Sequence, residues 1–255
     1  MGLVDTHCHL TYGALAADPA GAWRRAREAG VDAAVVVAID AASAPGVLDF
    51  VAGHPELRAA VGIHPNEVAA AGAGDMRRIA ELAAHPAVVA IGESGLDTYW
   101  DRAPLALQRR YLDRHAELAL ARDLPLVLHL RDTYPLAVEA LEPYRASGLR
   151  GVVHCFAGEA DEADPFIEWG WPISYSGILT YPQADNVRAA ARRTPLPQCL
   201  VETDAPWLTP RGHGKVDNEP AFVVTTARRL AAVKELPFAT VAAATTDNAR
   251  AAFGL

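Results

Sequence analysis

The sequence has few of the features that mark disulfide-stapled or membrane proteins. Its 255 residues include only three cysteines, a sparse and odd number that argues against a disulfide scaffold and is typical of a reducing compartment. No segment approaches the run of about 18 uncharged apolar residues that a membrane helix needs. The start also lacks the basic and apolar regions of a signal peptide. We therefore expect a cytoplasmic chain that does not bind a membrane.

Lysine and net positive charge are scarce as well. Lys215 and Lys234 are the only lysines, and the formal net charge is -8. An acidic balance argues against a broad electrostatic footprint on nucleic acid, which usually shows as a basic domain. It leaves room for a small basic site on an acidic surface.

Three catalytic motifs are absent. The chain has no Gly-x-x-x-x-Gly-Lys-Ser/Thr phosphate loop, no Gly-x-Ser-x-Gly elbow and no glycine-rich dinucleotide turn after a strand. The first absence excludes most P-loop nucleotide chemistry. The other two weaken the serine-hydrolase and dehydrogenase hypotheses.

Short apolar runs alternate with alanine-rich amphipathic segments along the whole chain. The runs predict strands over residues 3–6, 33–38, 58–61, 88–92, 125–128, 151–153, 172–175 and 199–202. The other segments predict helices over residues 20–29, 44–52, 76–84, 105–121, 135–147, 161–168, 183–193, 221–230 and 237–252. Apolar strands that alternate with helices indicate a covered parallel sheet. Eight such units favour a (β/α)8 TIM barrel over an open doubly wound sheet, and with no linker in view we predict one domain over residues 1–255.

Polar side chains that can bind metals stand at the ends of the predicted strands, where a barrel carries its chemistry. His7 and His9 are two residues apart, so in a strand they share a face. Other strand ends add a mixed nitrogen and oxygen set, and the candidate ligands are His7, His9, Glu93, His129, His154 and Asp204. Imidazole suits zinc, and carboxylates favour manganese or magnesium. The alternative is that these buried histidines only hydrogen-bond the backbone.

Six ligands are more than one catalytic ion needs if it is to keep a position open for water. They suit two divalent ions, Mg²⁺, Mn²⁺ or Zn²⁺, that share a bridging carboxylate. Glu93 is the predicted bridge, because neither lysine lies near a suitable strand end to form a carboxylated lysine. The alternative for Glu93 is a carboxylate that caps the following loop.

Other residues near strand ends suggest proton transfer and substrate binding. Asp204 can accept a proton from a water at the metal ions, and Glu202 supports a histidine or has a buried structural role. His64 either donates to a substrate phosphate or orders its loop. Arg131 either binds phosphate oxygens or pairs with a neighbouring acid such as Asp132.

The loop after the last strand and several aromatics offer further substrate contacts. Residues 207–215 are rich in glycine and cations, and Arg211 and Lys215 can hold an anionic substrate there. The aromatics Tyr99, Trp100 and Trp207 can stack on bases or close the barrel rim. His54, His85 and His115 are predicted to be surface or structural residues.

The strand-end motifs resemble those of the TatD family of metal-dependent hydrolases. The motifs are Asp5-Thr6-His7-Cys8-His9-Leu10, Gly62-Ile63-His64-Pro65, Gly92-Glu93-Ser94-Gly95-Leu96-Asp97, His129-Leu130-Arg131-Asp132, His154-Cys155-Phe156, residues 202–210, Asn218-Glu219-Pro220 and Asn248-Ala249-Arg250 with Phe253. The resemblance covers essentially the whole chain. It implies a TIM barrel of the amidohydrolase superfamily and a divalent-metal-dependent phosphodiesterase, usually described as a deoxyribonuclease.

Carried over by position, the resemblance implies the same six metal ligands and places His64 and Arg131 beside the scissile phosphate. The chain departs from the family pattern in two places. Ala157 stands where a small hydroxyl residue is usual. In the loop, His213-Gly214 intrude before Lys215 and Val216-Asp217 replace a second base, so fewer cations stand there than is usual.

These observations together predict a phosphodiesterase that acts on DNA ends, as an exonuclease, with a metal-bound hydroxide as the nucleophile. The chain is expected to be a monomer or a weak oligomer. One alternative is a small-molecule ester, lactone or amide hydrolase that uses the same metal ions, which the net charge of -8 favours. A second alternative is a binding protein that has lost catalysis.

Overall fold

The computed structural model describes residues 2–255, and its strands follow one another in the sheet in chain order from β1 to β8. The strands are β1 Leu3–Cys8, β2 Val31–Val37, β3 Leu57–Val61, β4 Val88–Asp97, β5 Leu126–Arg131, β6 Gly151–Val153, β7 Ile173–Tyr175 and β8 Cys199–Val201. The pairs β1–β2, β3–β4, β4–β5, β5–β6 and β7–β8 are parallel, as buried apolar strands joined by helices require.

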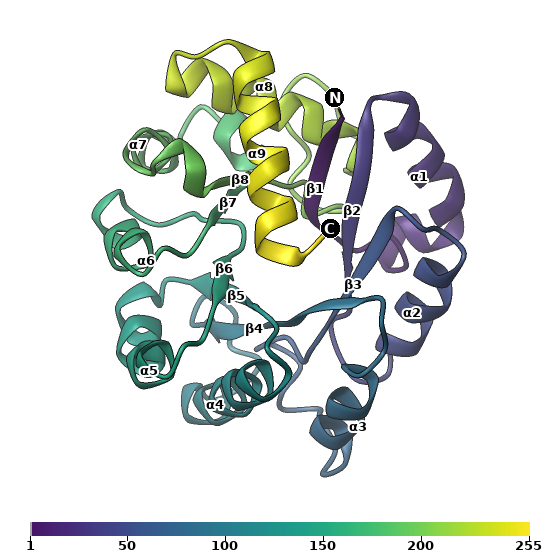
Figure 1. Cartoon of the computed structure of the whole chain (residues 1–255), viewed down its shortest axis with the longest axis vertical. Helices are drawn as coiled ribbons and strands as arrows, with labels where there is room; N and C mark the ends of the chain where they lie inside the picture. Colours follow the sequence, from purple (N-terminus) through teal and green to yellow (C-terminus); the bar gives the residue numbers. More distant parts are fainter. Residues whose placement is uncertain (1) are drawn as a thin grey trace. The chain divides into compact units, whose positions relative to one another are not determined.

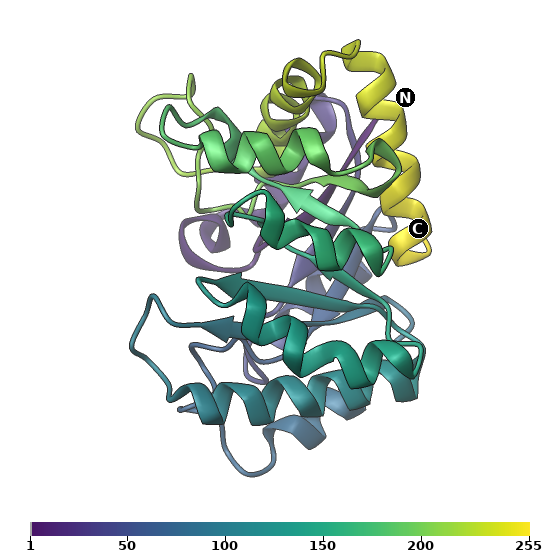
Figure 2. The same ribbon diagram turned by 90° about the vertical axis from the view of Figure 1, so that its left-hand side faces the viewer.

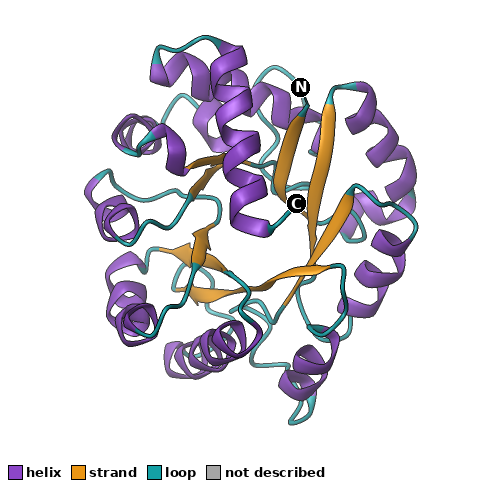
Figure 3. Ribbon diagram, viewed as in Figure 1, coloured by secondary structure: helices purple, strands orange, loops and turns teal. Residues whose placement is uncertain are grey.

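Helices alternate with these strands (Figures 1 and 3). They are α1 Pro19–Glu28, α2 Ala44–Ala52, α3 Asp75–Leu82, α4 Leu105–Arg122, α5 Tyr134–Ala146, α6 Asp164–Glu168, α7 Asp185–Arg193, α8 Val223–Lys234 and α9 Phe238–Phe253. Short 3₁₀ turns lie at Gly13–Ala17, Asp161–Ala163, Gly177–Thr180, Leu196–Gln198 and Pro220–Phe222. This order confirms the predicted (β/α)8 barrel. No helix within residues 2–255 is long and apolar enough to cross a membrane.

The chain divides into two compact units. The first unit runs up to Val36 and resumes at Cys155, and the second unit is Val37–His154. The single domain predicted over residues 1–255 stays a prediction.

In the first unit, helix α9 packs on β1 and β8 (Figure 1). Val241, Thr245 and Ala249 are buried at four-residue intervals, which gives α9 one continuous inner face. Asn248 Nδ2 donates to the carbonyls of Leu196 and Cys199, at 2.8 and 2.9 Å. An isolated parallel bridge joins Cys8 to Ala205 and so ties the end of β1 to the segment that follows β8.

In the second unit, α4 packs on β4 and runs beside α5 (Figure 2). Two polar residues of α4, Gln108 and His115, are 1% and 0% exposed. They are seven residues apart and therefore lie on one helix face. Gln108 contacts the end of β4 and His115 contacts the residue before His64, so α4 positions two strand ends.

The ends of two strands differ from the prediction. Strand β4 continues five residues beyond the predicted end at Gly92, and β5 continues to Arg131 rather than ending at Leu128. Pairing explains the difference, because Gly95 lies opposite His129 and Asp97 opposite Arg131 in the parallel ladder. The polar residues predicted a strand end, but the backbone hydrogen bonds of the ladder continue past them. Glu93, His129 and Arg131 are therefore strand residues.

Several other boundaries also differ from the prediction. Strand β2 begins at Val31 rather than residue 33, and β1 continues to Cys8, so His7 lies within it. The predicted helix over residues 161–168 is a 3₁₀ turn followed by the short α6. Helix α8 begins after a 3₁₀ turn and continues to Lys234 rather than ending at residue 230. Helix ends commonly shift in this way.

Candidate functional site

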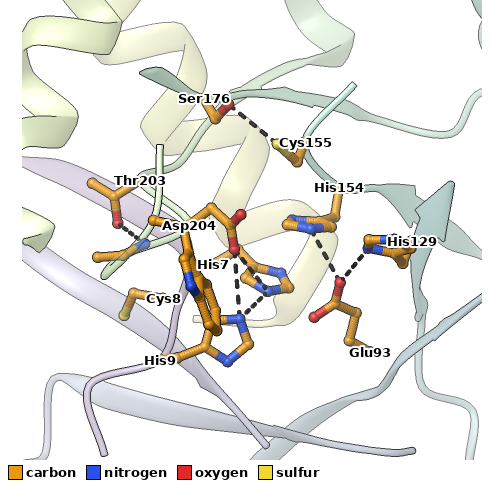
Figure 4. Close-up of polar contacts among 12 residues, drawn as sticks. His7, Cys8, His9, Glu93, His129, His154, Cys155, Ser176, Thr203 and Asp204 are labelled. Atoms are coloured by element: carbon orange, nitrogen blue, oxygen red, sulfur yellow. Dashed lines mark hydrogen bonds and ion pairs between the residues drawn. The ribbon is translucent and has the colours of Figure 1, made fainter. Parts of the chain in front are cut away.

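Two histidines and an aspartate form a cluster in the first unit. His7 in β1 and His9 just after it are each 1% exposed, and their Nε2 atoms are 3.1 Å apart (Figure 4). Asp204 Oδ1 lies 3.5 Å from His9 Nε2 and 3.9 Å from His7 Nε2. The predicted shared face of His7 and His9 therefore exists. Two imidazole nitrogens and one carboxylate oxygen converge here, which is a donor set that suits a transition metal ion.

The backbone turns Asp204 into this cluster. Asp204 has a φ of 58°, a left-handed conformation that is uncommon for a residue other than glycine. Its N–H donates to the His7 carbonyl at 2.9 Å, and its carbonyl accepts from the Trp207 N–H at 3.0 Å. Strained backbone of this kind persists where the surrounding structure enforces it, often at functional sites.

Asp5 holds β1 against the segment after β8. Its Oδ1 accepts from the N–H groups of Thr203 and His7, at 2.9 and 3.3 Å, and its Oδ2 accepts from Thr203 Oγ1 at 2.6 Å. Asp5 is fully buried, and burial outweighs these bonds and raises its pKa to about 8. Asp5 is thus a positioning residue behind His7, a role that the sequence analysis did not assign.

Aromatic residues stand beside the cluster of the first unit. The Trp207 ring packs edge-on against His9 with centroids 5.1 Å apart, and Tyr12 lies 5.6 Å from Trp207. Buried Asn218 holds this segment, since its Nδ2 donates to the carbonyls of Thr203 and Trp207 at 2.8 and 2.6 Å. Trp207 is 44% exposed, so part of its ring faces solvent.

Glu93 is the centre of a second cluster, in the second unit. Its Oε1 lies 2.8 Å from His129 Nδ1, 3.2 Å from His154 Nε2 and 3.6 Å from His64 Nε2. Figure 4 shows the contacts to His129 and His154. Glu93 is only 2% exposed, and a buried carboxylate needs such partners. The three imidazoles come from β5 and from the segments after β6 and β3.

His129 also contacts a carboxylate with its other ring nitrogen. Its Nε2 lies 3.1 Å from Asp97 Oδ2, which also accepts from Asn66 Nδ2 at 3.0 Å. Burial lowers the pKa of His129, but the hydrogen bonds to Asp97 and Glu93 outweigh burial and raise it. Burial likewise raises the pKa of Asp97, and hydrogen bonds from His129, Trp100 and Asn66 reverse this and lower it to about 2.

Close backbone approaches shape the second cluster. A Cβ on Gly62 would lie 2.6 Å from backbone atoms of Gly92, and a Cβ on Gly95 would lie 1.9 Å from the His129 carbonyl oxygen. Only glycine allows the strands to approach this closely. Gln108 then fixes the end of β4, because its Oε1 accepts from the Asp97 N–H at 2.7 Å and its Nε2 donates to the Asp97 carbonyl at 2.9 Å.

His115 supports the segment that carries His64. Its Nε2 accepts from the Ile63 N–H at 3.0 Å, and its Nδ1 lies 2.7 Å from the Tyr111 carbonyl. An acceptor at Nε2 and a donor at Nδ1 define a neutral ring. Complete burial lowers the pKa of His115 to about 4, which keeps it neutral. Of the two roles predicted for His115, the structure shows the structural one.

Each cluster contains three residues whose ligand atoms lie within 4.8 Å of one another. These groups are His7, His9 and Asp204 in the first unit, and His64, Glu93 and His129 in the second. The chemistry of both donor sets fits a divalent ion. The structure therefore adds His64 to the possible ligands, besides its predicted roles of donating to a substrate phosphate or ordering its loop.

The predicted substrate cations lie in different surroundings. Arg131 places its guanidinium over the Tyr99 ring, 4.5 Å from the centroid. Arg211 and Lys215 are exposed in the loop after β8, where the Arg211 N–H donates to Thr180 Oγ1 at 2.8 Å. The intruding His213 stacks on Phe222 at 3.8 Å and so anchors this loop. A substrate role for these cations stays a prediction.

Sequence reasoning missed Asp97, Asp5 and Gln108. A signal existed for Asp97, because in a continuous strand it shares a face with Glu93 and Gly95. Asp5 offered a similar signal, because it directly follows the apolar residues Leu3 and Val4 in its strand and precedes His7 by two residues. Gln108 lies in a helix, and its contact with β4 has no local signal.

Comparison with known proteins places these features in a family. The protein-family model described as TatD related DNase matches residues 4–254 of this chain. The chain is 38% identical over 262 residues to the uncharacterized metal-dependent hydrolase TatD of Mycobacterium tuberculosis, with 99% of this chain and 98% of the relative covered. It is 33% identical over 251 residues to the uncharacterized metal-dependent hydrolase YabD of Bacillus subtilis, with 98% of each covered. The crystal structure of the TatD homologue YjjV from Escherichia coli superimposes with a TM-score of 0.94 at 30% identity, covering 99% of this chain and 98% of that one.

Proposed function

The chain belongs to the TatD-related DNase family of metal-dependent hydrolases, and from this premise we propose that it is a phosphodiesterase that cleaves DNA from a free end. The observation that carries the proposal is the pair of clusters, each with imidazole nitrogens and a carboxylate within 4.8 Å. Donor sets of this kind support two divalent ions, which are the cofactors of phosphodiester hydrolysis in many enzymes.

We assign the metal ions to residues of both units, on the prediction that the six strand-end residues serve one reaction. His7, His9 and Asp204 would hold one ion, and Glu93, His129 and His154 would hold the other. Bound ions would lower the pKa of a water nucleophile and neutralise charge on the phosphate oxygens. Mg²⁺, Mn²⁺ and Zn²⁺ all suit these ligands.

The side chains have separate proposed roles. The Asp204 carboxylate takes the proton of the attacking water, for which its 15% side-chain exposure leaves access. His64 and Arg131 donate hydrogen bonds to the non-bridging phosphate oxygens. Arg211 and Lys215 attract the flanking phosphates of the strand. The phosphorus–oxygen bond to the leaving sugar breaks as the water oxygen bonds to phosphorus, and the leaving oxygen takes the proton back from Asp204, so the products are a nucleotide and a shortened strand.

A nuclease assay tests this proposal. End-labelled single-stranded DNA is incubated with the chelator-stripped protein and then with added Mg²⁺, Mn²⁺ or Zn²⁺. We expect stepwise shortening from one end that depends on the added ion and is lost in Asp204→Asn. Absence of cleavage with every ion, or full activity in that variant, would contradict the proposal.

Two observations favour a second candidate, a small-molecule ester, lactone or amide hydrolase. The net charge is -8, and the loop after β8 has Val216 and Asp217 where the family usually has a base. An acidic surface repels a long polyanion. A panel that compares a lactone, an amide and a DNA oligomer at equal metal concentration separates the two candidates. A cytoplasmic location and a monomeric or weakly oligomeric state stay predictions.

A further inference from the structure

Two large aromatic side chains are exposed next to each other after β4. Tyr99 and Trp100 are 55% and 52% exposed, and their rings meet edge to face with centroids 4.9 Å apart at 85°. Aromatic rings contribute to stability mainly when buried, so a solvent-facing pair gains little for folding. An adjacent exposed pair of this kind is more typical of a binding surface. We call Tyr99 and Trp100 the aromatic pair.

An arginine guanidinium group lies over each ring of the aromatic pair. Arg131 lies over Tyr99, 4.5 Å from the centroid, and Arg102 lies over Trp100 at 5.8 Å. Arg102 also lies 3.8 Å from Glu67, in an exposed ion pair that is easily exchanged. Flat apolar rings flanked by arginines are the combination that holds unpaired bases and their phosphates.

A single carboxylate connects the aromatic pair to the metal cluster of the second unit. Asp97 Oδ1 accepts from the N–H groups of Tyr99 and Trp100, at 2.9 and 3.0 Å. Its other oxygen lies 3.1 Å from His129 Nε2. The backbone that carries both rings is therefore fixed relative to a predicted metal ligand. A base held on the rings would place its phosphate at a set distance from that ligand.

We propose that one unpaired nucleobase of single-stranded DNA stacks on one ring of the aromatic pair and meets the other ring at its edge, with Arg131 on the scissile phosphate beside that base and Arg102 on the neighbouring phosphate. This inference rests on the proposed function, because the base belongs to the nucleotide next to the scissile bond. A base inside a duplex is already stacked and paired, so the surface selects frayed or single-stranded ends. Stacking accepts any base, so no sequence preference follows.

The experiment measures binding of a fluorescein-labelled thymidine oligonucleotide with phosphorothioate linkages, by anisotropy, to the Mn²⁺-loaded protein. An abasic nucleotide is placed at each position of the oligonucleotide in turn. We expect one position near an end where the abasic nucleotide weakens wild-type binding by between about fivefold and a hundredfold. Trp100→Ala and Tyr99→Ala should bind the intact strand more weakly and no longer respond to the abasic nucleotide at that position. Such non-additivity is the signature of a direct contact.

Conservative and control variants make the test specific. Trp100→Phe and Tyr99→Phe keep a ring and should keep most of the response to the abasic position. Leu236→Ala removes another exposed apolar side chain, 38% exposed after α8, and should bind as the wild type does. Steady-state cleavage should show a raised KM in Trp100→Ala with a much smaller change in kcat, because the ring holds the base and does not contact the reacting phosphate.

The outcomes separate this inference from the proposed function. If the wild type hydrolyses bis(p-nitrophenyl) phosphate and DNA, but the two alanine variants keep the full abasic response, the stacking inference is overturned and the function stands. Equal loss of binding to duplex and single strand in those variants also overturns the inference. If the wild type hydrolyses no phosphodiester, the proposed function fails. The anisotropy measurements on intact and abasic oligonucleotides still show whether the rings hold a base.

Discussion

The two clusters use the same residue types but pair them differently. In the first unit, His7 and His9 turn their Nε2 atoms toward each other at 3.1 Å, and Asp204 stands at 3.5 Å or more from both. In the second unit, Glu93 and Asp97 each contact a ring nitrogen of His129, at 2.8 and 3.1 Å. The first cluster brings two imidazole nitrogens within hydrogen-bond distance of each other, whereas in the second cluster two acids contact one imidazole.

This difference affects how the histidine nitrogens of each cluster hold protons. Only one proton can lie between the two facing nitrogens of His7 and His9, because a hydrogen bond needs one donor and one acceptor. His129 has a raised pKa and holds protons more tightly than an ordinary imidazole. A metal ion that binds His129 must displace a proton, so its affinity rises with pH. We therefore expect metal binding at the second cluster to strengthen as pH rises.

The largest expected effect comes from Asp204→Asn in the first cluster. Loss of the proton acceptor should lower kcat by about 10²- to 10⁴-fold, the usual contribution of a general base. Steady-state cleavage of single-stranded DNA in saturating Mn²⁺ measures it. Asp217→Asn, an exposed change in the loop after β8, is the control and should leave kcat close to the wild-type value. A decrease below tenfold in Asp204→Asn would remove Asp204 from its proposed role.

Asp97→Asn tests the acid–imidazole pairing of the second cluster. We expect metal affinity to decrease by about 10- to 100-fold, because carboxylates that orient a ligand histidine typically contribute this much. Titration calorimetry with Mn²⁺ at several pH values measures both the affinity and its pH dependence. The metal affinity of the variant should depend less on pH, because His129 loses one of the partners that raise its pKa. Exposed Asp101→Asn is the matched control. Unchanged affinity in Asp97→Asn would mean that His129 needs no such support.

His115 tests the scaffold of the second unit rather than its ligands. Its pKa is lowered to about 4, so between about pH 6.5 and pH 4 the unfolded chain binds a proton that the folded chain does not. Stability from this residue is complete above pH 6.5 and is lost as pH falls toward 4. At pH 4.5 the loss is about 2–3 kcal/mol.

Urea denaturation of the wild type and His115→Gln at pH 7 and pH 4.5 measures this loss. The glutamine variant cannot take up the proton, so its decrease in unfolding free energy should be smaller by that amount. His85→Gln changes an exposed histidine and should follow the wild type. If the free energy of unfolding decreases equally in the wild type and His115→Gln between pH 7 and pH 4.5, His115 does not titrate as a buried neutral ring.

The smallest effect is expected at the exposed loop of the first unit. Arg211→Ala should raise the KM for DNA only a few fold and reduce the slope of log affinity against log salt by about one. Binding measured across a salt series gives the slope. Arg24→Ala, in helix α1 with 70% of its side chain exposed, serves as the control. An equal change in both variants would indicate general charge attraction instead of a contact at Arg211.

Much of the fold was predictable because its signals are local. The alternation of apolar runs and amphipathic segments predicted the strands and helices in the right order, and the barrel follows from eight such units. The strand ends were wrong at β4 and β5, where the polar residues Glu93 and His129 lie within ladders that continue past them. The sequence pattern could not show this, because whether a polar residue stays in a strand depends on its neighbour across the ladder.

The sequence by itself determined the family and the barrel topology, and it predicted six metal ligands. These depend on residue type and on spacing within a single strand, which a chain carries without reference to its fold. Tertiary structure decided what positions those ligands. Gln108 reaches Asp97 from another element, His115 reaches Ile63 across 52 residues, and Asp5 reaches Thr203 across 198. Such contacts depend on how elements pack, and no local pattern encodes them.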